Sequence, residues 1–331
     1  MKLATLKNGS RDGALLVVSR DLSLAVSAIE IAPTMQAAID DWANVRERLG
    51  ALYQRLNRGE LPEAFALRPD ALDAPLPRAY QFLDGSAYPA HMRAVRKARG
   101  AAMPADFDTV PLLYQGNSDR FLAAHEPIEF LDDEPLGIDY EAEIVVVTDR
   151  VPQGTTPERA KRHVILLGLL NDTSLRSIIA SEIPRGFGFM QGKPFRTLGP
   201  VFVTPDELGA AWDGRWLAGT YISEARGAMI GTLNPAEGAS FGYHELIAHG
   251  ARTRDLSAGT LLGLGAIAAP EGERSRGCGC LAELRAHEQL ETGQAVTPFL
   301  RFGDEVRLEM FDSTGLSIFG AIQQRIEKIA A

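Results

Sequence analysis

The first quarter of the chain alternates apolar runs with turn residues and then changes to a helical pattern. The stretch "LATLKNGSRDGALLVVS" separates apolar runs by Asn-Gly and Asp-Gly pairs, which predicts a β-hairpin within residues 1–30. Residues 34–56 repeat apolar side chains at helical spacing, and Thr34 suits the N-cap of that helix. Three prolines in "RPDALDAPLPRAY" then end the periodicity. We therefore expect a small N-terminal domain at residues 1–75 and a larger one at 76–331.

The larger part mixes strands and helices without regular alternation. Runs rich in β-branched residues predict strands at 143–147, 200–203 and 305–310. The segment "TPERAKRHVILLGLLND" (156–172) is interpreted as a helix, because Thr156 and Glu158 beside a proline suit a helix N-terminus. The segment "FGYHELIAHGAR" (241–252) predicts a second helix. This order favours an α+β fold over a doubly wound sheet.

One predicted strand, "GIDYEAEIVVV" (137–147), carries acidic residues at alternate positions. Asp139, Glu141 and Glu143 would share one face of a continuous strand, and burying an unpaired carboxylate costs several kcal/mol. A solvated edge or arginine partners would remove the conflict, and so would a divalent cation. Asp84 and Asp172 add carboxylates in apolar or turn-rich surroundings. Oxygen ligands of this kind favour Mg²⁺, Ca²⁺ or Mn²⁺ over zinc or copper.

A histidine and a lysine accompany these acids. His91 lies seven residues after Asp84 in "DGSAYPAHMRAVRKARG", whereas the other five histidines have no comparable neighbourhood in sequence. The basic residues that follow His91 suit either a solvated helix face or a site for an anionic substrate. The segment "RGFGFMQGKPF" is interpreted as a loop that presents Lys193. The "GLGAIA" pattern at 263–268 matches a dinucleotide-binding fingerprint, but a loop rather than a helix should follow it, so we reject that function.

Composition narrows the class of protein. The net charge of −9 argues against non-specific nucleic-acid binding, and no apolar run approaches the roughly 20 residues of a membrane span. The N-terminus lacks the apolar region of a signal peptide. Cys278 and Cys280 are one residue apart, so a bridge between them would be strained, and a zinc site would need partners from distant segments. We expect reduced thiols in a cytoplasmic protein.

Taken in order, "DGSAYPAH", "GIDYEAEI", "LLNDTSLR", "FMQGKPF" and "CLAEL" resemble the fumarylacetoacetate hydrolase family, over roughly residues 70–325. The resemblance implies a mixed β-roll or sandwich C-terminal domain, a small α/β N-terminal domain and a homodimer. It implies a divalent cation, Mg²⁺ or Ca²⁺ with Mn²⁺ as an alternative, held by Asp84, Glu141, Glu143 and Asp172. Asp139 stays outside this ligand set.

The same resemblance assigns roles around the metal. His91 matches the general base and Glu283 the carboxylate that orients it. Arg176 and Lys193 match cations that stabilise negative charge, and Tyr114 matches a substrate-contacting tyrosine. Two positions depart from the family pattern. Ile179 replaces a glutamine, and Ala266, in "GAIA", replaces a threonine that contacts the substrate carboxylate.

These residues imply a metal-dependent hydrolase that cleaves a carbon–carbon bond in a β-diketone acid. The first candidate reaction converts fumarylacetoacetate to fumarate and acetoacetate. Within the family, the alternatives are an acylpyruvate or fumarylpyruvate hydrolase and a hydratase or decarboxylase of 2-oxo acids. From another class, a non-catalytic divalent-metal-binding protein remains open. The changes at Ile179 and Ala266 lean toward a substrate unlike that of the archetype.

Overall fold

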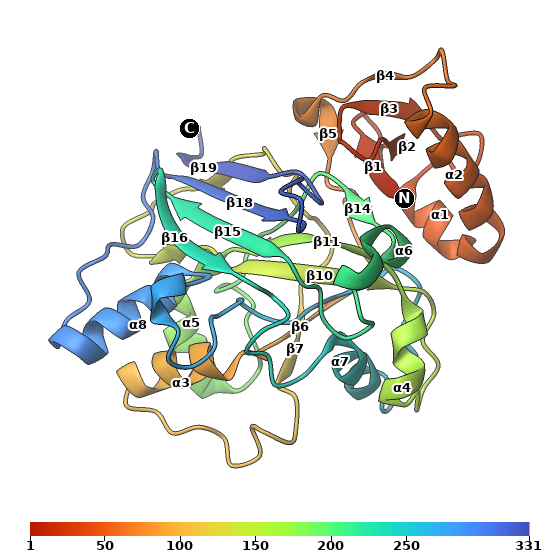
Figure 1. Cartoon of the computed structure of the whole chain (residues 1–331). Helices are drawn as coiled ribbons and strands as arrows, with labels where there is room; N and C mark the ends of the chain where they lie inside the picture. The colour runs from red at the N-terminus through yellow and green to blue at the C-terminus, as the bar shows by residue number, and fades with distance from the viewer. Residues whose placement is uncertain (331) are drawn as a thin grey trace.

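A computed structural model describes residues 1–330 and has an α+β architecture in which two large sheets are layered (Figure 1). Within those residues, twelve strands form one mixed sheet. In spatial order its main path is β4 (Phe65–Ala66), β3 (Leu24–Ser27), β2 (Ala14–Val18), β1 (Lys2–Leu6), β14 (Phe202–Val203), β11 (Val164–Asp172), β10 (Ala142–Thr148), β17 (Thr260–Gly263), β6 (Gln81–Gly85) and β7 (Leu113–Gly116). β13 (Arg196–Leu198) pairs with β11, and β5 (Leu72–Asp73) pairs with β1.

A second sheet lies across β10 and β11 (Figure 1). Its order is β16 (Ala228–Leu233), β15 (Thr220–Ala225), β18 (Glu305–Phe311), β19 (Ile322–Lys328) and β8 (Ile128–Phe130). The short strands β9 (Ile138–Asp139) and β12 (Ser174–Leu175) pair separately. Most neighbouring strands are antiparallel, while β17 with β6 and β19 with β8 are parallel.

Helices surround these sheets. They are α1 (Met35–Asp40), α2 (Trp42–Asn57), α3 (Pro89–Ala98), α4 (Pro157–Ala160), α5 (Arg176–Glu182), α6 (Pro205–Leu208), α7 (Tyr243–Gly250) and α8 (Leu281–Thr292). Short 3₁₀ turns occur at η1 (Pro69–Ala71), η2 (Lys161–His163), η3 (Ile183–Arg185), η4 (Gly209–Ala211) and η5 (Arg274–Arg276). Over residues 1–330, none of the helices combines the length and the apolar character that crossing a bilayer requires.

β10 is buried on both faces, and its alternating side chains serve two cores. Ile144 and Val146 pack in one core with residues of the second sheet, such as Met310. Val145 and Val147 belong to the other core, which the N-terminal helices α1 and α2 help to cover. Successive side chains of a strand point to opposite faces of the sheet, so alternate residues of β10 enter different cores. Because both faces are apolar, the strand reads as a continuous hydrophobic run.

The same property explains a wrong prediction. The segment 156–172 was expected as one helix, but only α4 and the following 3₁₀ turn are helical, and residues Val164–Asp172 form β11. β11 is buried along its whole length and pairs with β10, β13 and β14. A run buried on every side has no polar face, so its periodicity cannot separate helix from strand.

Other elements agree with the sequence more closely. The β1–β2 hairpin, α7 and the three predicted strands are present, although the strand expected at 200–203 is reduced to β14. The Thr34 side chain accepts a hydrogen bond from the Ala37 amide, which confirms the cap. The helix expected at 34–56 is divided at Asp41 into α1 and α2. The "GLGAIA" segment begins at the last residue of β17 and continues into a loop. The dinucleotide-binding fingerprint needs a helix there, so its rejection is consistent with the structure.

The domain division near residue 75 stays a prediction, since one sheet runs through both parts. β1 pairs with β14, with Leu3 opposite Phe202. Figure 1 shows the N-terminal strands and helices standing beside this junction. The N-terminal segment therefore extends the central sheet and is joined to it by backbone hydrogen bonds.

Phe202 tests this junction. Its ring is fully buried and lies so close to Gly168 that a Cβ there would be 2.5 Å from the ring. We expect Phe202→Ala to cost about 3–5 kcal/mol of unfolding free energy, because it leaves a cavity between the two parts. Thermal or urea unfolding measures this, with Phe65→Ala as a control, since Phe65 is 40% exposed. Equal effects of the two substitutions would contradict the account.

Candidate active site

Four carboxylates from separate parts of the chain converge below the surface. Asp84 lies on β6, Glu143 on β10 and Asp172 at the end of β11, while Glu141 immediately precedes β10. All four residues are buried, and each offers an oxygen within 4.8 Å of those of the others. The structure thus brings together all four predicted metal ligands.

A glycine makes room for this approach. Gly263 of β17 pairs with Asp84 on one side and with Val145 on the other, so it stands between β6 and β10. A Cβ at Gly263 would lie 2.5 Å from Asp84 Oδ1 and 2.8 Å from Glu143 Oε2. The first glycine of the "GLGAIA" pattern therefore allows two carboxylates to meet across an intervening strand.

Any two of these four carboxylates repel each other when both carry a negative charge. Burial, followed by the charge of Asp172, raises the pKa of Asp84 to about 7. Burial, followed by the charge of Asp84, raises the pKa of Glu143 well above its ordinary value. Among the described residues, neither a hydrogen bond nor an ion pair reaches Asp84 Oδ1 or Glu143 Oε1. Buried, unpartnered carboxylate oxygens in a group of four converging carboxylates fit a hard divalent cation.

Two basic side chains compensate part of this charge. Lys193 Nζ lies 2.5 Å from Glu141 Oε2 and 2.7 Å from Asp172 Oδ2. Arg176 lies 2.8 Å from Glu141 Oε1 and 2.8 Å from Asp139 Oδ2. Burial opposes ionisation of Glu141, but Lys193 and then Arg176 hold the pKa of Glu141 below its ordinary value. The site therefore contains one carboxylate, Glu141, whose pKa is lowered and two, Asp84 and Glu143, whose pKa values are raised.

Arg196 is a member of the site that the sequence analysis missed. It is fully buried, its Nε lies 3.2 Å from Asp172 Oδ1, and its guanidinium carbon lies 4.5 Å from the centre of the Phe82 ring. It also donates a 3.0 Å hydrogen bond to the Tyr114 hydroxyl, which in turn donates to Asp172 Oδ2 at 2.9 Å. An arginine within the apolar stretch after Lys193 was the available signal. Tyr114, which was predicted to contact the substrate, lines the cavity described below. Its hydroxyl donates a hydrogen bond to Asp172.

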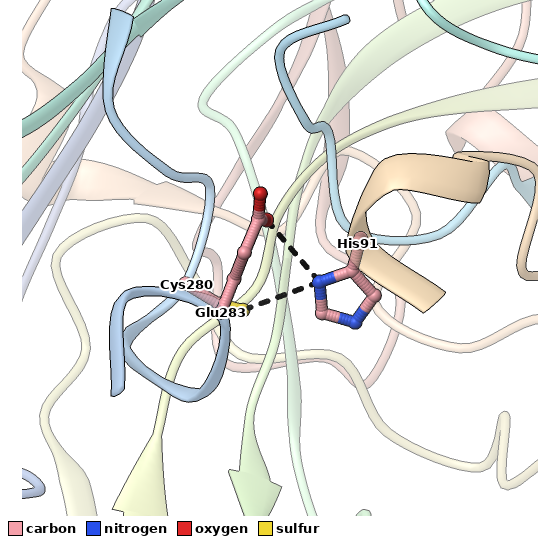
Figure 2. A group of neighbouring side chains, drawn as sticks. All are labelled: His91, Cys280 and Glu283. Carbon is pink, nitrogen blue, oxygen red and sulfur yellow. Dashed lines mark hydrogen bonds and ion pairs between the residues drawn. The ribbon is translucent and has the colours of Figure 1, made fainter. Parts of the chain in front are cut away.

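His91 and Glu283 meet between two helices. His91 lies in the first turn of α3, Glu283 lies in the first turn of α8, and His91 Nδ1 is 3.2 Å from Glu283 Oε2 (Figure 2). The other Glu283 oxygen lies 3.6 Å from His287 Nε2. Burial alone would raise the pKa of Glu283, but the neighbouring His287 and His91 side chains lower it below its ordinary value. The sequence analysis gave His287 no role, but helical i, i+4 spacing places it beside Glu283.

Asp139 has a different place from the one its spacing suggested. The predicted strand is interrupted after β9, and Asp139 pairs with Ser174 of β12. Its two oxygens accept 2.9 Å hydrogen bonds from the Leu281 and Ala282 amides, at the N-terminus of α8. Arg176 Nε donates to Asp139 as well, at 2.8 Å. Asp139 therefore connects the carboxylate cluster, through Arg176, to the helix that carries Glu283.

A cavity of about 530 Å³ lies over this cluster. Its lining includes Asp84, His91, Glu141, Tyr114, Arg176, Lys193, Ile179 and Ala266. The two positions that depart from the family pattern thus face the cavity with apolar side chains. Arg96 of α3 and Arg99, which follows the helix, also line the cavity. Each donates a hydrogen bond to a backbone carbonyl, and within residues 1–330 no carboxylate forms an ion pair with either guanidinium.

Comparisons with known proteins agree with this arrangement. The family model described as fumarylacetoacetase N-terminal domain 2 matches residues 1–78, and that of the fumarylacetoacetate (FAA) hydrolase C-terminal matches residues 81–327. No curated protein sequence matches the chain.

Solved structures share the fold at low sequence identity. The chain resembles maleylpyruvate hydrolase from Sphingobium sp. SYK-6, solved with manganese(II) and pyruvate (15% identity, 99% of each chain covered, TM-score 0.65). It also resembles fumarylacetoacetate hydrolase from Exiguobacterium antarcticum (17% identity, 99% of each chain covered, TM-score 0.64). A third is 2-hydroxyhepta-2,4-diene-1,7-dioate isomerase from Mycobacterium marinum (14% identity, 100% of each chain covered, TM-score 0.58).

The raised pKa values predict that protons leave when a divalent cation binds. At pH 6.5, below the pKa of about 7 for Asp84, binding of Mg²⁺ or Mn²⁺ should release on the order of one proton, because a protonated carboxyl competes with the ion. Titration calorimetry in two buffers of different ionisation enthalpy measures this release. We expect the affinity to fall as the pH falls below 7. An observed enthalpy that does not depend on the buffer would contradict the electrostatic description of the site.

Proposed function

The chain belongs to the fumarylacetoacetate hydrolase family, and from this premise we propose that it is a divalent-metal-dependent hydrolase acting on the carbon–carbon bond of a β-diketo acid. The first candidate reaction is the hydrolysis of fumarylacetoacetate to fumarate and acetoacetate. The observation that carries the proposal is the convergence of four buried carboxylates below a cavity that Asp84, Glu141 and His91 line, with Glu283 bound to His91.

In this proposal Asp84, Glu141, Glu143 and Asp172 hold the ion, which when bound supplies Lewis-acid polarisation of a carbonyl and stabilisation of an enolate. Glu283 accepts a hydrogen bond from His91 Nδ1–H, which leaves the Nε2 lone pair to take a proton from water. The water oxygen bonds to the carbonyl carbon, and the carbon–carbon bond breaks with its electron pair on the departing enolate. The proton held by His91 then returns to that fragment.

Lys193 and Arg176 would stabilise the negative charge that develops on the substrate carbonyl oxygen during the reaction. Lys193 and Arg176 already contact Glu141, and both line the cavity, where their remaining donors can meet the oxyanion. Such donors typically contribute about 3–4 kcal/mol each to a transition state. Their contact with Glu141 fixes them in place before the substrate arrives.

Arg96 and Arg99 favour a substrate with a second anionic group. Arg99 is an exposed residue, and its partial burial, followed by the positive charges of Arg176 and Arg96, lowers its pKa. A guanidinium with no acidic partner among the described residues, in a cavity that already contains cations, is stabilised by an incoming carboxylate. We therefore propose a dicarboxylic substrate.

The apolar side chains of Ile179 and Ala266 on the cavity wall favour a second candidate within the family, an acylpyruvate or fumarylpyruvate hydrolase, because they offer the substrate no hydrogen bond there. The resemblance to maleylpyruvate hydrolase supports this candidate. A hydratase or decarboxylase of 2-oxo acids would use the same metal site. The reading as a non-catalytic metal-binding protein is weaker, because binding alone needs no oriented imidazole.

Two further properties belong to the proposal. A cytoplasmic location is supported by Cys278 and Cys280, which are free and buried. A homodimer is proposed from the family resemblance.

The His91→Ala variant tests the role of the base. We expect it to lower turnover by about 10²–10⁴-fold while leaving Mg²⁺ affinity unchanged, because the imidazole lies outside the carboxylate cluster. Turnover of fumarylacetoacetate and of an acylpyruvate panel, with calorimetric metal binding, measures both properties. His249→Ala on α7 is the matched control. Full activity of His91→Ala on a substrate that the native protein hydrolyses would exclude the proposed mechanism.

Arg99→Met tests the second anionic group. We expect it to raise KM for dicarboxylic substrates by about tenfold or more, since a charged hydrogen bond is lost, while monocarboxylic analogues are affected little. Steady-state kinetics with paired substrates measures the difference. A uniform effect on both classes would remove Arg99 from substrate recognition.

A further inference from the structure

Cys280 stands beside the His91–Glu283 pair and has no part in the proposed reaction. Its Sγ lies 3.8 Å from His91 Nδ1, the same nitrogen that lies 3.2 Å from Glu283 Oε2. The sulfur, nitrogen and oxygen atoms all lie within 4.8 Å of one another. Figure 2 shows the thiol and the carboxylate facing Nδ1, whereas the second ring nitrogen points away from both.

These separations match those of ligands that share one tetrahedral zinc ion. With bonds of about 2.3 Å to sulfur and about 2.0–2.1 Å to nitrogen, tetrahedral angles place the two ligand atoms about 3.6 Å apart. Nitrogen and oxygen ligands are about 3.4 Å apart by the same geometry. The observed distances, 3.8 Å and 3.2 Å, differ from these values by a few tenths of an ångström.

We propose that His91, Cys280 and Glu283 form a second metal site, selective for a thiophilic cation such as Zn²⁺, whose occupation inhibits the enzyme. The site differs in chemistry from the four-carboxylate cluster, because thiolate and imidazole select softer ions than oxygen ligands do. His91 lines the active-site cavity, so an ion can enter there and keep a water molecule as its fourth ligand. Glu283 lines a separate cavity of about 340 Å³.

Inhibition follows from the two nitrogens of His91. In the metal-free pair Nδ1 carries the proton donated to Glu283, and Nε2 can accept one. A cation on Nδ1 requires that nitrogen's lone pair, so the ring proton moves to Nε2 and the imidazole can no longer act as a base. The Cys280 thiol releases its proton to solvent, and thiolate plus carboxylate balance the +2 charge. The inhibition rests on the proposed role of His91, whereas the binding does not.

Cobalt(II) provides a readout that does not depend on turnover. With Mg²⁺ in excess to occupy the carboxylate cluster, titration of the whole protein with Co²⁺ should produce thiolate-to-cobalt charge-transfer absorption in the near ultraviolet. We expect Cys280→Ala to remove this absorption and to weaken Zn²⁺ binding by more than about tenfold. Mg²⁺-supported turnover should persist in this variant and resist Zn²⁺, while a chelator should reverse inhibition of the native enzyme.

Cys278→Ala is the matched control, because Cys278 forms a different group with Glu283 and His287. We expect this variant to keep both the absorption and the sensitivity to Zn²⁺. The proposal is overturned if no absorption appears, if Cys278→Ala rather than Cys280→Ala removes it, or if Zn²⁺ inhibits Cys280→Ala as strongly as the native enzyme. Absorption without inhibition would keep the metal site and contradict the role of His91 as base. Thermal unfolding of both variants establishes that each is folded.

Discussion

Electrostatic repulsion among four buried carboxylates is the constraint on which the rest of this structure depends. Burying even one unpaired carboxylate costs several kcal/mol, and here Asp84, Glu141, Glu143 and Asp172 converge. Lys193, Arg176 and Arg196 reduce the repulsion without filling the centre of the cluster. A divalent cation at that centre would balance the negative charge. Because its binding relieves the repulsion among the carboxylates, that repulsion favours binding of the ion.

The scaffold explains how such a site is held. The strands that carry it are buried on both faces, so the cores on either side hold β10 and β11 rigidly. Asp139 links the carboxylate cluster to the helix that carries Glu283. It binds Arg176, which contacts Glu141, and it accepts hydrogen bonds from the first amides of α8, whose Glu283 lies beside His91. One buried carboxylate thus positions the carboxylate cluster and the His91–Glu283 pair relative to each other, although it contacts neither His91 nor Glu283 itself.

Sequence reasoning found the residue types of the site but not all of their positions. The alternating acids around Glu141 and the spacing between Asp84 and His91 are local features, so the chain itself displays them. The resemblance to a family was needed to join them with Glu283, which comes from a distant helix. β11 was mistaken for a helix because a run buried on both faces lacks periodicity. The partners of Arg196 and the contact between Cys280 and His91 depend on tertiary packing. The pairing of His287 with Glu283 follows from i, i+4 spacing once helix α8 is known.

The most direct test of the central claim is the position of the ion. Anomalous diffraction from crystals grown with Mn²⁺ locates manganese independently of the protein density. The account predicts one strong peak within about 2.0–2.6 Å of oxygens from Asp84, Glu141, Glu143 and Asp172. A peak elsewhere, or an unoccupied cluster at saturating Mn²⁺ with the four carboxylates still converging, would contradict it.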